Sequence, residues 1–150
     1  MHMNSEKIYV FVYGSLKQGY GNHRHLGLSG IGSELLAKNI RTVRSDFRML
    51  SYGSFPGVYK KLSFSRTPGK HISGELYEVT PAVLDRLDDL ESNGTFYTRE
   101  LVEIEGFNKL AWMYVLEPRL SQDQKSYAKS KIRIKVLNKD TYFWCQHFRR

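Results

Sequence analysis

The chain has 150 residues with 41% apolar and 25% charged side chains and a net charge of +8, which is ordinary for a soluble globular protein apart from the basic balance. No apolar run approaches the roughly 20 residues that a membrane-spanning helix needs, and the first residues lack the basic region and cleavage site of a signal peptide. Cys145 is the only cysteine, which excludes an intrachain disulfide and a thiolate metal cluster. We therefore expect a single cytoplasmic domain over residues 1–150, without membrane association.

The first predicted strand, IYVFVY at residues 8–13, runs directly into a loop that begins Gly14-Ser15-Leu16. Gly14 can adopt backbone angles that are closed to other residues, so the N–H groups of this loop can turn together onto an anion. The loop lacks the glycine spacing of a P-loop or of a dinucleotide site, and an ordinary glycine turn is the simpler interpretation. From the residues alone, both interpretations stand.

Further strands are predicted where β-branched and aromatic residues are frequent, at 55–62, 71–79, 97–105 and 109–116, with a weaker candidate at 41–50. One helix lies among them. It opens with Thr80 as N-cap and Pro81 at the first helical position, and Asn93-Gly94 is its predicted C-cap. A single helix among many strands predicts an α+β fold with a mixed or mainly antiparallel sheet, able to close into a small barrel.

The helix carries a carboxylate on its apolar side. Leu84 and Leu87 belong to the stripe Val83-Leu84-Leu87-Leu90, and Glu91 lies seven and four residues after them, whereas Asp85, Asp88 and Asp89 lie mostly off the stripe. Desolvation and the negative end of the helix dipole both raise the pKa of a carboxyl group in this place, which suits a general base. Alternatively, the helix frays early and Glu91 reaches solvent.

The segment from about residue 120 is a basic C-terminal extension that carries +6 of the net charge. A basic face can attract nucleic acid or an acidic partner. In KIRIKV, however, the bases 131, 133 and 135 alternate with apolar residues, which favours a solvated strand face. We therefore expect no specific nucleic-acid contact. His23 and His25 match no metal-ligand spacing, and no metal site is expected.

The ordered motifs resemble the γ-glutamyl cyclotransferase-like family, and within it the γ-glutamylamine cyclotransferase branch. The resemblance covers nearly the whole chain up to about Glu117. It is carried by the YGSL loop after the first strand, by the acid of LDDLES and by the following YTR. The family's fold is a small mixed β-barrel with flanking helices, which agrees with the α+β interpretation.

The resemblance implies a role for each motif residue. Tyr13, Gly14, Ser15 and Leu16 would hold the α-carboxylate end of a γ-glutamyl substrate, largely through backbone N–H groups, with Tyr97 as a further substrate-binding residue. Glu91 would be the catalytic acid and base.

The resemblance also implies a reaction. The α-amine of the substrate attacks its γ-amide, and 5-oxoproline and a free amine are released without metal or cofactor. The expected partner is thus a small γ-glutamyl amine or peptide. The alternative hypothesis is a catalytically silent binding or regulatory module of the same fold, whose basic segment contacts nucleic acid or another acidic partner. Neither the released group nor the oligomeric state is predicted.

Overall fold

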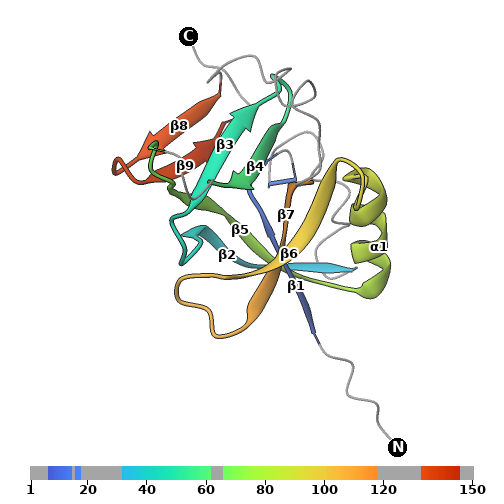
Figure 1. Cartoon of the computed structure of the whole chain (residues 1–150). Coiled ribbons are helices and arrows are strands. Elements are labelled where there is room, and N and C mark those ends of the chain that lie inside the picture. Colours follow the sequence, from blue (N-terminus) through green and yellow to red (C-terminus); the bar gives the residue numbers. More distant parts are fainter. Residues whose placement is uncertain (1–6, 15, 18–31, 62–65, 118–132, 146–150) are drawn as a thin grey trace, which may run out of the picture.

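The structure is a computed structural model that describes residues 7–14, 16–17, 32–61, 66–117 and 133–145. The described residues form nine β-strands and one α-helix (Figure 1). In chain order the elements are β1 (Ile8–Val12), β2 (Ser33–Arg41), β3 (Phe47–Ser51), β4 (Pro56–Lys60), β5 (His71–Val79), α1 (Pro81–Leu90), β6 (Tyr97–Glu103), β7 (Leu110–Leu116), β8 (Ile134–Leu137) and β9 (Thr141–Trp144).

Most strands belong to one mixed sheet. Its order is β6-β7-β1-β5-β9-β8, and β2 pairs with β5 off this path. β1 is parallel to β7 and β5 is parallel to β9, whereas the other pairs of this sheet are antiparallel. β3 and β4 form a separate antiparallel hairpin. This mixed sheet with its single described helix confirms the predicted α+β class.

The sheet closes into a barrel only in part. Just beyond β2 and β6, Thr42 and Ile104 form an isolated antiparallel bridge. Val43 N–H donates to the Glu103 carbonyl and Glu105 N–H donates to the Arg41 carbonyl, both at 3.0 Å. These contacts join β2 to β6 at one end, but no continuous ladder between the two strands forms among the described residues. The expected closed barrel is therefore reduced to a sheet bridged at one end.

The inner strands β1 and β7 have nearly continuous apolar sequences, as expected for strands that are covered on both faces. Along β1, Val10 and Val12 pack in the cluster that includes the helix residues Val83 and Leu87. Phe11 packs on the opposite face, in the cluster with hairpin residues of β3 and β4. Because side chains alternate across a strand, one short segment contributes to both clusters.

The N-terminus of the helix is as predicted, and its C-terminus is not. The Thr80 hydroxyl oxygen accepts a hydrogen bond from Val83 N–H at 3.2 Å, so Thr80 is the N-cap. The helix ends at Leu90, before the predicted stop at Asn93-Gly94. Leu90 is 37% exposed, so the buried stripe is shorter than the sequence pattern indicated.

The C-terminal strands belong to the main sheet. β9 pairs with the first residues of β5, and Trp144 is fully buried. Of the strand predicted in KIRIKV, residues 134–136 lie in β8, and residues 131 and 132 lie outside the described residues. Ile134 packs against the core, whereas Val136 is 47% exposed, so the apolar residues of β8 are only partly buried. In the part of the chain that the structure describes, no helix is long and apolar enough to cross a membrane.

Candidate active site

A cavity of about 420 Å³ lies where the end of β1, the β3–β4 hairpin, the C-terminus of α1 and the start of β6 meet. Its size is within the range of small-molecule sites. The described residues that line it come from these elements and from β7: Phe11, Val12, Tyr13, Gly14, Leu16, Ser54, Phe55, Pro56, Leu90, Glu91, Ser92, Phe96, Tyr97 and Tyr114. Most of the residues that the motifs singled out are thus brought together.

Glu91 is the C-cap of α1. Two backbone bonds complete the helix end: Ser92 N–H donates to the Asp89 carbonyl at 3.2 Å, and Asn93 N–H donates to the Asp88 carbonyl at 2.9 Å. With Ser92 in the left-handed region at φ 49°, this is the Schellman arrangement. The helix end therefore fixes the backbone of Glu91 beside the cavity.

Burial raises the pKa of the Glu91 carboxyl from 4.5 to about 7. The side chain is half-buried in the cavity wall, where the charged form loses part of its hydration. Near pH 7 the group therefore exists in both forms in comparable amounts, so it can take up and return a proton. This agrees with the sequence-based expectation of a raised pKa.

A polar network holds the helix turn that carries Glu91. The Asp88 carboxylate accepts hydrogen bonds from Arg99 Nε at 2.9 Å and from the Tyr114 hydroxyl at 2.6 Å, on the neighbouring strands β6 and β7. The Arg99 guanidinium also lies 4.2 Å from the centroid of the Trp112 ring. Asp88 was expected to lie mostly off the apolar stripe, and its contacts with the neighbouring strands were not predicted. Through them it ties the C-terminus of the helix to the sheet.

Two tyrosines of the motifs line the cavity, with their hydroxyl groups bonded to backbone. The Tyr13 hydroxyl donates to the Tyr114 carbonyl and the Tyr97 hydroxyl donates to the Pro56 carbonyl, each at 2.6 Å. Burial raises the pKa of both phenols well above its usual value, and the Glu91 charge raises it further. Both phenols therefore stay neutral and are suited to shape the cavity.

The loop after β1 is close to the hairpin. Lys17 N–H donates to the Gly14 carbonyl at 3.1 Å, which closes a tight turn. A Cβ on Gly14 would lie 2.9 Å from the ring of Pro56. Gly14 is not among the described residues with positive φ, so the unusual backbone angle considered from the sequence is not the reason for glycine here. The reason is the close approach of Pro56, which leaves no room for a side chain. Leu16 is buried and lines the cavity, and Ser15 lies outside the described residues.

Lys17 follows the motif residues and its buried role was not predicted. Its ammonium group donates to the Trp144 carbonyl at 2.7 Å and lies 3.9 Å from the centroid of the Phe143 ring. Burial lowers the pKa of Lys17 to about 8. The loop after β1 is thereby joined to β9. No local sequence pattern indicates this contact, because the partner is more than 100 residues away in the chain.

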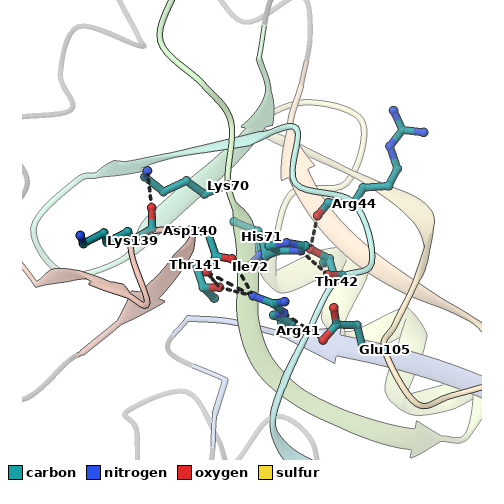
Figure 2. Close-up of polar contacts among 10 residues, drawn as sticks. All are labelled: Arg41, Thr42, Arg44, Lys70, His71, Ile72, Glu105, Lys139, Asp140 and Thr141. Carbon is teal, nitrogen blue, oxygen red and sulfur yellow. Dashed lines mark hydrogen bonds and ion pairs between the residues drawn. The ribbon is translucent and has the colours of Figure 1, made fainter.

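A second hollow, of about 620 Å³, lies beside Arg41 at the far end of β2. Figure 2 shows Arg41 pointing toward Asp140 and Thr141 of the β8–β9 hairpin and toward Glu105. Arg41 Nη1 lies 3.2 Å from both carboxylate oxygens of Asp140, and Arg41 Nε lies 2.9 Å from Glu105. The acids are paired with the guanidinium, so this network ties the hairpin to β2.

The described residues contain no group of three or more His, Cys, Asp or Glu side chains placed to hold a metal ion. Glu91 is the one carboxylate among the described residues that line the 420 Å³ cavity. A single half-buried carboxylate beside a small-molecule cavity is suited to proton transfer.

Residues 10–145 match the protein family described as gamma-glutamyl cyclotransferase, AIG2-like. A putative gamma-glutamylcyclotransferase of Methanocaldococcus jannaschii is 32% identical over 109 residues, which are 71% of this chain and 82% of that protein. YtfP of Escherichia coli K12, a gamma-glutamylcyclotransferase family protein, is 29% identical over 109 residues, or 72% of this chain and 81% of that one. The crystal structure of an AIG2-like protein from mouse has a TM-score of 0.62 at 25% identity, covering 79% of this chain and 82% of that chain. The resemblance of the motifs is thus confirmed, and the chain belongs to the AIG2-like gamma-glutamyl cyclotransferase family.

Proposed function

We propose that this protein is a γ-glutamyl amine cyclotransferase that converts its substrate to 5-oxoproline and a free amine. The observation that carries the proposal is Glu91, a carboxyl group with a pKa of about 7 in the wall of the cavity beside the loop after β1. In this proposal Glu91 is the general base and acid. Tyr13, Gly14, Ser15 and Leu16, with Tyr97, bind the glutamyl end of the substrate. The reaction needs neither metal nor cofactor, and we place it in the cytoplasm.

The proposed reaction begins with a proton transfer. The Glu91 carboxylate takes a proton from the α-ammonium group of the substrate and leaves a neutral amine. This nitrogen attacks the γ-carbonyl carbon, a C–N bond closes the five-membered ring, and the carbonyl oxygen becomes an oxyanion. The amide C–N bond then breaks as the protonated Glu91 gives its proton to the departing nitrogen. The ring nitrogen still carries one proton too many and releases it to the freed amine, so the products are the neutral lactam and an alkylammonium ion. Glu91 ends as a carboxylate, ready for another cycle.

The attacking and attacked groups belong to one molecule, so the protein's main contribution is positioning. Holding a tethered nucleophile in the ring-closing geometry contributes on the order of several kcal/mol to the barrier reduction. The wall formed by Tyr13 and Tyr97 supports this role, because both hydroxyl groups are fixed on backbone carbonyls. Backbone N–H groups of the loop are the proposed donors to the substrate carboxylate.

Release of 5-oxoproline tests the proposal. Purified protein is incubated with a panel of γ-glutamyl amines and peptides, and 5-oxoproline and the free amine are both quantified by mass spectrometry. We expect equal amounts of the two products from at least one γ-glutamyl amine, and none with Glu91→Gln. A folded wild-type protein that releases no 5-oxoproline from any compound would contradict the proposal. If a folded Glu91→Gln variant forms product at more than a few per cent of the wild-type rate, Glu91 is not the general base.

A further inference from the structure

We propose that Phe55 and Phe96 form a subsite for an apolar, preferably aromatic, substituent on the amine that the enzyme releases. This inference rests on the proposed function and specifies its substrate class. Both rings are half-buried and line the cavity that Glu91 lines. Their centroids lie 6.0 Å apart with the planes at 74°, in an edge-to-face contact.

The two rings come from separate elements that meet at the cavity. Phe55 is the last residue of the β3–β4 turn, and Phe96 directly precedes β6. Phe96 N–H donates to the Ser92 carbonyl at 3.1 Å, so the Phe96 backbone is bonded to the residue that follows Glu91. The aromatic wall is therefore adjacent to the proposed base. A γ-glutamyl unit that presents its amide to Glu91 leaves the substituent on the amide nitrogen to contact these rings.

Contacts within the protein hold the aromatic side chains of this wall in place. Tyr52 stacks on Phe55 with centroids 5.1 Å apart, and Tyr52 N–H donates to the Phe55 carbonyl at 2.9 Å. Arg133 Nη1 donates to the Gly53 carbonyl at 3.1 Å and so holds the turn from outside. On the other side, the Phe96 ring contacts the Tyr97 ring edge-to-face at 4.9 Å. A preorganised surface of this kind favours binding because few side chains must be ordered.

The chemistry of the wall favours an apolar group. Leu90, at the end of the helix, also lines the cavity and is 37% exposed, so three partly exposed apolar side chains gather in one wall. Burying apolar surface stabilises a complex in proportion to the area removed from water. Each buried methylene group raises the binding constant by about a factor of four. Aromatic rings gain further from offset or edge contacts with other rings.

The test compares substrates whose reacting groups are the same. The substrates γ-glutamylethylamine, γ-glutamylbutylamine and γ-glutamylphenethylamine all release a primary alkylamine, so differences in kcat/KM report on the substituent. For the wild-type enzyme we expect kcat/KM to rise along the series, and to be at least about tenfold higher for the phenethyl than for the ethyl compound. Equal values for the two compounds would overturn the subsite.

Variants assign the preference to the two rings. Phe55→Leu and Phe96→Leu keep apolar volume but remove the ring, and each is expected to lower the phenethyl-to-ethyl ratio by about threefold or more. Because the ratio is taken within one variant, a general loss of activity cancels. Phe107→Leu is the matched control, since Phe107 packs against Tyr9 with centroids 4.9 Å apart and does not line the cavity. A ratio that falls equally in the control variant would contradict the assignment.

Binding separates this proposal from the proposed function. Titration calorimetry with Glu91→Gln measures the affinities for the phenethyl and ethyl compounds without turnover. Tighter binding of the phenethyl compound, lost in the double variant with Phe96→Leu, supports the subsite even if no substrate is converted. Turnover of all three compounds without any preference supports the proposed function and overturns the subsite.

Discussion

Replacing Glu91 by glutamine should change how the stability of the protein depends on pH. In the folded protein the pKa of Glu91 is about 7, against 4.5 in an exposed carboxyl group. Between these values the folded state binds more protons at this site than the unfolded state does. The free energy of unfolding therefore falls as pH rises through this range, because the fold must accommodate a poorly solvated carboxylate.

The magnitude follows from the two pKa values. A rise from 4.5 to about 7 corresponds to about 3 kcal/mol, and the partial exposure of Glu91 places the expected effect at about 2–3 kcal/mol. Glutamine has no charge to desolvate, so the Glu91→Gln variant lacks this destabilising contribution. The variant should thus gain about 2–3 kcal/mol of unfolding free energy relative to wild type between pH 4.5 and pH 8.

Urea unfolding followed by tryptophan fluorescence measures this difference, at several pH values and for both proteins. Subtracting the two curves removes every other titrating group, because all of them are shared. If the difference in unfolding free energy does not change with pH over this range, the pKa of Glu91 is not raised by burial and the reasoning is refuted. In the same range kcat/KM of the wild type should rise with pH through about 7, since the base must be deprotonated to act.

Four further predictions concern residues around the site and the C-terminal strands. Gly14→Val should cost about 1–3 kcal/mol of stability and most activity, measured by thermal unfolding and turnover, because its side chain meets Pro56; Gly14→Val with wild-type values would contradict this packing. Asp88→Asn should lower kcat by roughly tenfold with KM nearly unchanged, because the turn bearing Glu91 loses its ion pair; a change in KM alone would contradict a positioning role. Ser92→Gly should raise the free energy of unfolding by about 1 kcal/mol and keep turnover, because glycine adopts φ 49° without strain; a loss of stability would contradict this. A short DNA duplex should bind no tighter than about 10⁻⁴ M at physiological salt in a two-salt titration, and tight sequence-dependent binding would favour the alternative of a binding module.

β5 could be predicted from the sequence, and β2 could not. β5 is found at the predicted residues 71–79, because buried apolar residues lie on both of its faces, Ile72 and Leu76 in one core cluster and Tyr77 and Val79 in the other. β2, Ser33–Arg41, was missed apart from its last residue. Its register with β5 shifts twice, and Asn39 adopts φ 52°, so the chain has no regular alternation for a pattern to detect.

Glu91 could be identified from the sequence as the candidate base, but the contacts that hold its helix turn in place could not. Glu91 stands out because a carboxylate follows an apolar stripe, which is local information. The contacts of Asp88 with Arg99 and Tyr114 join residues 11 and 26 positions apart, on three different elements. Such contacts depend on how the helix packs on the sheet, and spacing along the chain does not specify that packing. For the same reason the sequence did not indicate that Phe55 lines the cavity.

The early end of the helix bears directly on the chemistry of Glu91. Had α1 continued to Asn93, Glu91 would lie in its last turn, on the stripe of Leu84 and Leu87, which face the sheet. A carboxylate there would be more fully desolvated, and its pKa would lie further above neutrality. Instead the helix ends at Leu90, and Ser92 turns the chain through the left-handed region. Glu91 therefore remains between core and cavity, where the pKa is about 7 and where one carboxyl group can accept a proton and return it.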